Sequence, residues 1–356
     1  MVFEEWTTNG GGRIAVARLN SPRNLNSLSM DMIALLKPQL KRWAEDSSVC
    51  AVWLEAEGDK AFCAGGDIVS LNRSMTEPGK RGEGERFFTE EYELDYQIHT
   101  YPKPIVCWGN GIVMGGGIGL MVGASHRVVT EHSKLAMPEV SIGLYPDIGA
   151  GWFLNRMPMR TGLFLGLTGA RMNAADALFV NMADRFVAHE LKPQVMDALA
   201  SADWRSASAH AVVSSVLRQF EQQSSEMLPE SAIRSHFDDI QQASDGDSLE
   251  LVVTQLQELA GRGDWLGKSV KGLAAASPTS LALMWRHYHR SRLDSLKQVL
   301  DNELQMSHHC LVHGEFAEGI RALLIDKDMQ PRWRYASLAE LENDWVEQFF
   351  SQAPGH

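Results

Sequence analysis

The sequence has few cysteines, and their positions argue against a disulfide framework. Its four cysteines, Cys50, Cys63, Cys107 and Cys310, show no paired spacing, and Cys107 lies inside an apolar run. Reduced thiols in a cytosolic setting are therefore expected. Cys63 lies beside two glycines but has no histidine nearby in the sequence to activate it, so a packing thiol is favoured over a nucleophile.

Long apolar runs and a surplus of positive charge are also missing. No window holds about 18 uninterrupted apolar residues, so no membrane partner is expected. The first residues, MVFEEWTTNGGGR, lack both the signal-peptide pattern and the Arg-rich character of a transit peptide, and a cytoplasmic location is predicted. The formal net charge of −12 argues against a nucleic-acid partner, since such binding neutralises phosphates.

Three motifs of other enzyme classes are absent or incomplete. No G-x-S-x-G element is present, which argues against an α/β-type serine hydrolase. The glycines of residues 117–123 imitate a dinucleotide-binding loop but lack its G-x-G-x-x-G spacing, so a nicotinamide enzyme is the weaker alternative. The histidines of residues 308–313 resemble a metal cluster, but adjacent histidines on a helix face different directions. No metal site is expected.

The beginning of the chain has the strand–helix–strand order of a parallel α/β fold. Residues 13–19 and 51–55 predict strands. Between them, apolar residues at helical spacing predict a helix over residues 30–46, with Ser29 as its N-cap and a kink or division at Pro38.

Further along, the pattern changes from mixed to helical. Residues 105–108 predict a buried strand, the charged and Gly-rich residues 77–85 predict a mobile loop, and residues 186–187 predict a last strand. The simplest division is an α/β core with the active site over residues 1–190, followed by a mostly helical region over residues 191–356.

Two Gly-rich bends are the first feature that indicates chemistry. Gly65-Gly66 follows one short apolar run, and Gly115-Gly116-Gly117 opens a helix after another. Glycine lets bare backbone approach a ligand with its N–H groups directed at it. Each bend can thus supply one N–H to a shared carbonyl oxygen. The alternative is that both are tight turns that allow close packing.

Two carboxylates follow in otherwise apolar surroundings. Glu139 comes directly after Met137-Pro138, and Asp147 follows eight residues later. Burying a carboxylate is costly and raises its pKa toward values useful in acid–base chemistry. A loop cap, or a structural ion pair with Arg156, is the alternative explanation.

Several long motifs resemble the crotonase superfamily of enoyl-CoA hydratases and isomerases. They are AFCAGGDI at 61–68, the glycine stretch 111–119, MPE at 137–139 with Gly143, FFxEEY at 87–92, IGLYPDIG at 142–149, SPTSL at 277–281 and EGxRALLIDKD at 318–328. The resemblance implies an α/β fold, the crotonase spiral of ββα units, with a helical C-terminal region. It also implies an acyl-CoA substrate, with coenzyme A as part of the substrate and no separate cofactor.

The reaction class follows from one departure from the family pattern. Hydratases of this superfamily carry two glutamates, and this chain has Gly119 at the first position and Glu139 at the second. The resemblance therefore favours hydrolysis of a short 3-hydroxyacyl-CoA, with 3-hydroxyisobutyryl-CoA of valine degradation as the substrate. An enoyl-CoA hydratase or isomerase is the first alternative. A non-catalytic acyl-CoA-binding protein is an alternative of another class.

The resemblance also assigns roles to residues. Backbone N–H groups of Gly66 and Gly116 form an oxyanion hole, Glu139 and Asp147 are catalytic, and Glu91 binds the substrate together with Gly116, Glu139 and Asp147. The candidate CoA contacts are Arg23, Leu25, Phe62 and Lys103. Related proteins commonly assemble as trimers, so a homo-oligomer is expected by resemblance.

Overall fold

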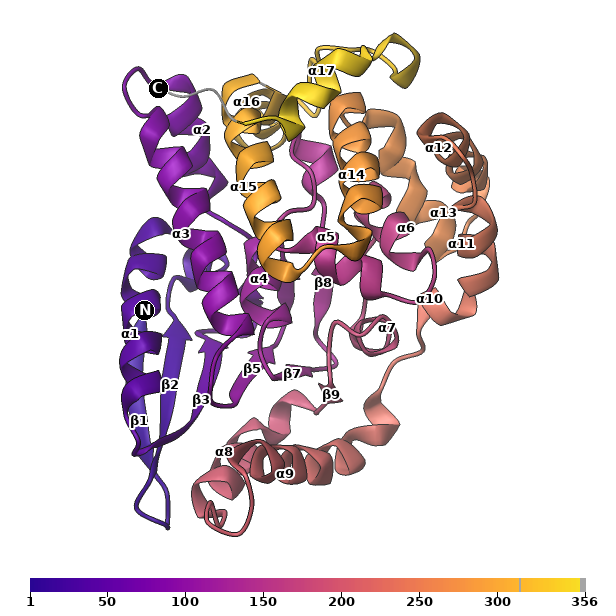
Figure 1. Ribbon diagram of the computed structural model, residues 1–356. Helices are drawn as coiled ribbons and strands as arrows, with labels where there is room; N and C mark the ends of the chain where they lie inside the picture. Colours follow the sequence, from indigo (N-terminus) through magenta and orange to yellow (C-terminus); the bar gives the residue numbers. More distant parts are fainter. Residues whose placement is uncertain (314, 353–356) are drawn as a thin grey trace. The chain divides into compact units, whose positions relative to one another are not determined.

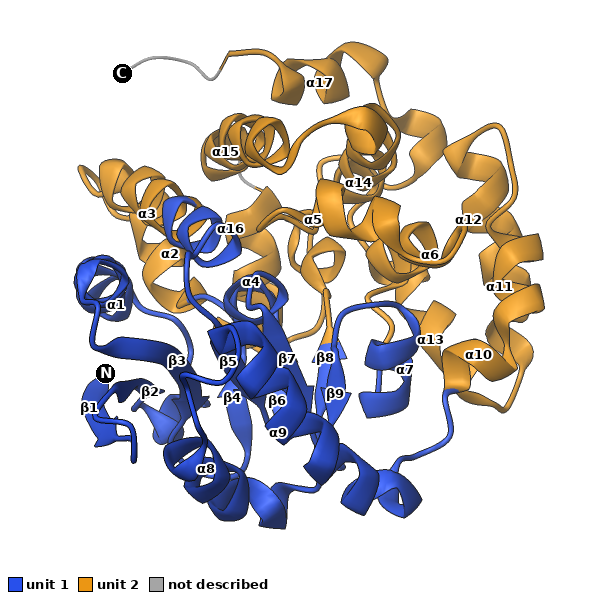
Figure 2. Ribbon diagram, turned by 60° about the horizontal axis from the view of Figure 1, so that its bottom comes forward, with its two compact units in different colours: residues 1–66, 93–135, 172–231 blue, residues 67–92, 136–171, 232–356 orange. Residues whose placement is uncertain are grey.

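The computed structural model describes residues 1–313 and 315–352 and divides into two compact units. Unit 1 comprises Met1–Gly66, Glu93–Leu135 and Met172–Ser231, and unit 2 comprises Asp67–Tyr92, Ala136–Arg171 and Ala232–His356 (Figure 2). None of these boundaries falls at residue 190, where the sequence predicts the α/β core to end. Each unit combines segments from both predicted regions.

Unit 1 is built on a six-stranded sheet in the order β1-β2-β3-β5-β7-β9 (Figure 1). β1 pairs antiparallel with β2, and the other neighbours are parallel. A second, three-stranded sheet has the order β4-β6-β8. The strands are β1 (Val2–Thr7), β2 (Arg13–Leu19), β3 (Val49–Ala56), β4 (Ala61–Cys63), β5 (Ile105–Gly109), β6 (Ile112–Met114), β7 (His126–Val129), β8 (Lys134–Ala136) and β9 (Arg185–Phe186).

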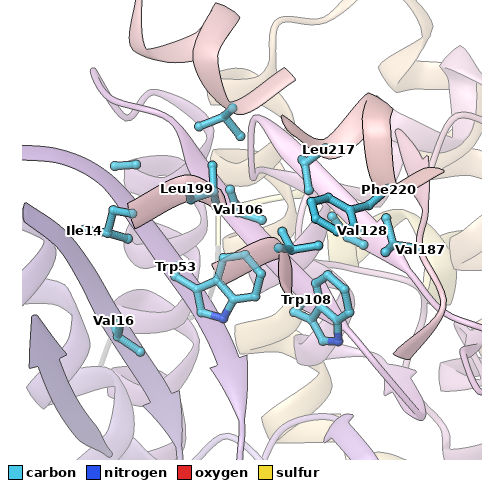
Figure 3. Close-up of a cluster of buried hydrophobic side chains, with 13 residues drawn as sticks. Ile14, Val16, Trp53, Val106, Trp108, Val128, Val187, Leu199, Leu217 and Phe220 are labelled. Atoms are coloured by element: carbon cyan, nitrogen blue, oxygen red, sulfur yellow. The ribbon is translucent and has the colours of Figure 1, made fainter. Parts of the chain in front are cut away.

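One face of the large sheet carries the core of unit 1. Alternate residues of successive strands, among them Trp53 and Trp108, point to this face, and their rings stack with centroids 5.4 Å apart (Figure 3). Leu199 and Leu217 of two helices cover them. The helices with residues in unit 1 are α1 (Met30–Glu45), the second half of α3 (Arg81–His99), α4 (Gly116–Val122), α7 (Ala174–Phe179), α8 (Lys192–Ser201) and α9 (Ala209–Ser224).

The first helix confirms the predicted cap but is not divided at Pro38. The Ser29 side chain accepts a hydrogen bond from the Met32 N–H, and α1 then continues through Pro38 to Glu45 without division. Proline inside a helix costs about 3 kcal/mol. Buried side chains on both sides of Pro38, including Leu36 and Leu40, hold the helix together.

Unit 2 is mostly helical. Its helices are α2 (Ile68–Thr76), the first half of α3, α5 (Ala150–Phe153), α6 (Thr161–Thr168), α10 (Ala232–Ser235), α11 (Phe237–Ala243), α12 (Leu249–Glu258), α13 (Trp265–Val270), α14 (Pro278–Arg290), α15 (Leu296–His313), α16 (Glu315–Ile320) and α17 (Asn343–Glu347). Among the described residues, no helix has the length and apolarity that a membrane crossing requires.

The predicted loop at residues 77–85 is wrong in its second half. Helix α3 already begins at Arg81, and Arg81 pairs with Glu85 one turn later. A Cβ on Gly84 would come within 2.4 Å of the Ser74 hydroxyl. The glycine that suggested a loop therefore permits close helix packing.

The core of unit 1 leads to the first prediction. Leu199→Ala in α8 should lower the free energy of unfolding by about 2–5 kcal/mol, because Leu199 is buried within the sheet-covering cluster. Leu35→Ala on the exposed face of α1 is the matched control, with an expected change within about 0.5 kcal/mol. Urea unfolding followed by circular dichroism measures both, and equal effects would contradict the assignment of this core.

Candidate active site

The two glycine bends lie at the ends of paired strands in unit 1. β4 and β6 are parallel neighbours, so the bends that follow their carboxyl ends lie at the same edge of the small sheet. A Cβ on Gly117 would come within 2.3 Å of the Cys63 carbonyl oxygen, which shows how closely the two segments approach. The structure thus brings together the segments that carry Gly66 and Gly116.

The Gly116 N–H belongs to the first turn of α4. The first backbone bonds of this turn run from Ile118 and Gly119 to the Gly115 carbonyl, and first-turn N–H groups have no acceptor within their own helix. Gly66 forms a bridge with Leu28, and the preceding Gly65 has a φ of 114°. These features fit the predicted oxyanion hole, and its assignment stays a prediction.

The space beside Gly119 is filled by another carboxylate. A Cβ on Gly119 would come within 2.8 Å of both carboxylate oxygens of Asp95, a fully buried residue of α3. A side chain at position 119 therefore has no room unless Asp95 moves. The sequence shows that a glutamate is missing here, but not what replaces it.

Glu139 of unit 2 is a buried carboxylate. It begins the 3-10 turn Glu139–Ile142 and is 5% exposed. Its Oε2 oxygen has no hydrogen-bond partner among the described residues. The turn ends at Gly143 with a φ of 77°, and a Cβ there would come within 2.3 Å of the Glu315 carbonyl oxygen. Only glycine fits this combination of φ and close contact.

Asp147 lies on a strained turn of the same unit. It is 4% exposed, and its Oδ2 accepts a 2.5 Å hydrogen bond from the Tyr92 hydroxyl. The next residue, Ile148, has a φ of 58°, which is rare for a β-branched residue and is common where surrounding structure fixes a functional site. The alternative ion pair with Arg156 is not found, since Arg156 donates to the Trp152 carbonyl and lies over its ring.

Burial raises the pKa of both carboxyl groups. The pKa of Asp147 is raised to about 7 by burial, with the Tyr92 hydrogen bond acting in the opposite direction and the charge of Glu303 adding to the rise. The pKa of Glu139 is raised well above its ordinary value by burial and then by the charge of Asp147. The charge on Asp147 therefore influences the ionisation of Glu139.

The predicted substrate contact Glu91 is buried as well. It is 3% exposed on α3, whereas its neighbour Glu90 is half-buried, because adjacent helix positions point in different directions. Its role in substrate binding stays a prediction.

The four predicted CoA contacts differ in their exposure and in the hydrogen bonds that they already make. Arg23 is exposed on a short turn, and Leu25 follows it in the left-handed region with a φ of 52°. Phe62 is buried in β4. The Lys103 ammonium donates to the carbonyls of Trp43 and Asp46 at the end of α1. These hydrogen bonds give the lysine a structural role that needs no bound CoA. The structure lends Lys103 no support as a CoA contact.

The cysteines and histidines have packing roles. The four cysteines, all within the described residues, form no disulfide, and burial raises the pKa of the Cys107 and Cys310 thiols. His309 and His313 stack on each other and contact the Phe349 ring. No group of metal-ligating side chains is found among the described residues.

Comparison with known proteins establishes the family. The enoyl-CoA hydratase/isomerase family model matches residues 14–350, so the chain belongs to this family, as its motifs predict. The 3-hydroxyisobutyryl-CoA hydrolase of Danio rerio mitochondria is 39% identical and covers 96% of this chain and 87% of its own. The human mitochondrial protein of the same name is 35% identical, and the match covers 98% of this chain and 88% of the relative. The 3-hydroxyisobutyryl-CoA hydrolase 1 of Arabidopsis thaliana is also 35% identical, with 95% of this chain and 89% of the relative covered.

Two solved structures share the fold over nearly the whole chain. An enoyl-CoA hydratase of Rhodobacter sphaeroides is 32% identical, with a TM-score of 0.83 and coverage of 99% of this chain and 97% of its own. A carnitinyl-CoA dehydratase of Mycobacterium thermoresistibile is 33% identical, with a TM-score of 0.86 and coverage of 99% and 96%. The predicted α/β crotonase fold with a helical C-terminal region is confirmed.

The raised pKa of Glu139 leads to a prediction about stability. Because this pKa is higher in the folded chain than in the unfolded one, ionising Glu139 costs folding free energy above the unfolded pKa, and the cost is complete above the folded pKa. Glu139→Gln removes this cost. The variant should be more stable than the wild type by on the order of 1 kcal/mol at pH 8, with the gain vanishing near pH 4.

Urea unfolding at the two pH values measures this difference. The exposed Glu250 of α12 is the matched control, and Glu250→Gln should leave the stability unchanged at both. A Glu139→Gln variant that loses stability at pH 8 would contradict the cost assigned to the buried carboxylate.

Proposed function

We propose that this chain is a thioester hydrolase that converts 3-hydroxyisobutyryl-CoA and water to 3-hydroxyisobutyrate and free CoA. The observation that carries the proposal is Glu139, a buried carboxylate whose Oε2 has no hydrogen-bond partner among the described residues. Structural carboxylates are paired when buried, and an unpaired one with a raised pKa is typical of a reactive group. Relatives named 3-hydroxyisobutyryl-CoA hydrolase over most of the chain support the choice of substrate.

The contact between Gly119 and Asp95 disfavours the hydratase alternative. Addition of water across a double bond uses two carboxylates in the hydratase pattern, and position 119 has no room for the first of them beside the Asp95 carboxylate. The two solved structures that share the fold over nearly the whole chain are nevertheless a hydratase and a dehydratase by name. The fold therefore does not discriminate between the reactions, and the site residues must.

The proposal assigns the thioester oxygen to the N–H groups of Gly66 and Gly116. As the carbonyl carbon is attacked, its oxygen becomes negative and the two donors stabilise it, an effect worth about 10²–10³ in rate per donor. Glu139 supplies the nucleophile, either its own carboxylate oxygen or a water molecule that it deprotonates. The carbon–sulfur bond then breaks, and CoA leaves as the thiolate, which takes up the proton released by the water molecule. If the Glu139 oxygen is the nucleophile, the acyl-glutamyl anhydride that forms is hydrolysed by water, which releases the acid and restores Glu139.

Asp147 and Glu91 are assigned to the acyl chain. Asp147 orients the 3-hydroxy group and exchanges protons with the reacting groups, which a pKa of about 7 suits. Glu91 holds the substrate hydroxyl. Hydrogen-bonding carboxylates of this kind would favour a 3-hydroxyacyl chain over an unsubstituted one.

The setting of the reaction follows from the substrate. Coenzyme A is part of the substrate, and no other cofactor is required by this chemistry. A role in valine degradation fits the relatives' substrate. The animal relatives are named as mitochondrial, so the cytoplasmic location and the homo-oligomer expected from the sequence both stay predictions.

A thiol-release assay over a panel of acyl-CoA thioesters tests the function. The wild type should release CoA from 3-hydroxyisobutyryl-CoA faster than from isobutyryl-CoA, because only the former offers a hydroxyl to Asp147 and Glu91. Glu139→Gln should lower kcat by about 10³-fold or more while acyl-CoA binding, measured by calorimetry, is retained, since the amide cannot act as nucleophile or base.

The alternatives give different results in the same panel. Loss of enoyl absorbance without thiol release would indicate a hydratase, and binding without any reaction would indicate an acyl-CoA-binding protein. Near-normal thiol release by Glu139→Gln would overturn the assignment of Glu139.

A further inference from the structure

The side chain of Asp147 is held by a buried tyrosine of the same unit. The Tyr92 hydroxyl donates to Asp147 Oδ2 over 2.5 Å, and Tyr92 is 3% exposed. A carboxylate has no proton to donate, so the proton of this short bond comes from the tyrosine. Tyr92 takes no part in the reaction as described above.

The oxygen of Tyr92 is itself fixed by a chain of buried hydroxyl groups. Ser307 Oγ lies 2.7 Å from the Tyr92 hydroxyl and 3.0 Å from the Tyr145 hydroxyl. Tyr145 donates to the Glu303 carbonyl oxygen over 2.7 Å. Because the Tyr145 hydroxyl donates its proton to this carbonyl, the Ser307 hydroxyl can donate to the oxygen of one of the two tyrosines. Such a connected network fixes the directions of its members.

The backbone beneath Asp147 is clamped independently. The Glu303 carboxylate accepts hydrogen bonds from the N–H groups of Gly149 and Gly151, at 2.6 and 3.0 Å, and lies 2.8 Å from His287 Nε2. This clamp holds the turn in which Ile148 has a positive φ. Helices α14 and α15, which supply His287 and Glu303, are labelled in Figure 1. The turn fixes the backbone position of Asp147, and the Tyr92 hydrogen bond fixes the direction of its carboxylate.

We propose that Tyr92 is a positioning residue for Asp147: its hydroxyl holds Oδ2 and fixes the direction in which the other oxygen meets the hydroxyl of the acyl chain. The part of this inference that concerns the acyl chain rests on the proposed function. The hydrogen bond also favours the ionised form of Asp147, which accepts from both the tyrosine and the substrate.

Several groups set the charge of Asp147 from the elements packed around it. Burial raises its pKa to about 7, the Tyr92 hydrogen bond lowers the pKa, and the charge of Glu303 raises it. Asp147 in turn affects the pKa values of Glu139, Tyr145 and Cys310. Removing the Tyr92 hydroxyl deletes the stabilising contact, so the pKa of Asp147 should rise further.

An infrared titration tests this inference without relying on turnover. The protonated-carboxyl band of Asp147 is identified as the one missing in Asp147→Asn, and its titration is compared between the wild type and Tyr92→Phe. Loss of the hydroxyl should move the midpoint of this band to higher pH by about one unit. Tyr288→Phe is the matched control, since the Tyr288 hydroxyl donates only a long hydrogen bond to the Met159 carbonyl, at 3.5 Å, among the described residues. It should leave the midpoint unchanged.

Kinetics give the second readout. Tyr92→Phe should lower kcat/KM for 3-hydroxyisobutyryl-CoA about 10- to 100-fold at pH 7 with a smaller loss at higher pH, because a misdirected Asp147 costs rate and a more alkaline solution restores its charge. Ser307→Ala should give a smaller loss of the same kind. Tyr288→Phe should match the wild type.

The outcomes separate this inference from the proposed function. An unchanged Asp147 midpoint in a folded Tyr92→Phe variant overturns the inference whether or not the enzyme hydrolyses thioesters. A shifted midpoint supports it even if the substrate proves to be different. Equal kinetic losses in Tyr92→Phe and Tyr288→Phe, with active wild type, would count against positioning while leaving hydrolysis intact.

Discussion

Burying two carboxylates in one apolar region is the constraint on which the structure of unit 2 depends. Ionised carboxylates are unstable in such surroundings unless the fold supplies donors or the groups hold protons. One oxygen of Glu139 has no hydrogen-bond partner among the described residues, and Asp147 accepts a hydrogen bond from the Tyr92 hydroxyl. The free energy for this arrangement comes from the surrounding helices, which hold Ile148, next to Asp147, at a φ of 58° that a relaxed chain would avoid.

The supporting contacts come from distant parts of the sequence. Gly143 lets the Glu139 turn approach the backbone at Glu315, and Glu303 of α15 binds the turn that follows Asp147. The helical C-terminal region thus contributes directly to the candidate site. Apart from its motifs at 277–281 and 318–328, the sequence of this region gave no sign of these contacts.

Local patterns predicted much of unit 1. The strand at residues 13–19 and the Ser29 cap are fixed by neighbouring residues, so periodicity and capping identify them. Pro38 and the glycines near Gly84 were misleading because tertiary packing overrides a local breaker. The short strands β4, β6 and β8 were missed as a sheet, because three-residue strands carry almost no periodic signal.

The same division between local and distant information applies to the candidate site. Glu139, Asp147 and the glycine bends were found because each lies in a motif that is readable on its own. Tyr92, Asp95 and Glu303 were not assigned roles, since each acts through a partner that folding brings near. Tyr92 lies within the FFxEEY motif, which marked the segment as important without showing that the hydroxyl is aimed at Asp147.

The pH dependence of kcat/KM for 3-hydroxyisobutyryl-CoA tests the central claim most directly, namely that a buried carboxylate pair performs the hydrolysis. Because Asp147 titrates at about 7 and the pKa of Glu139 is raised well above its ordinary value, the rate should increase with pH along a limb at pH 7 or higher. In Asp147→Asn, the remaining activity should rise at a lower pH than in the wild type, since removing the neighbouring charge lowers the pKa of Glu139. A limb near pH 4, where ordinary exposed carboxyl groups titrate, would contradict the account.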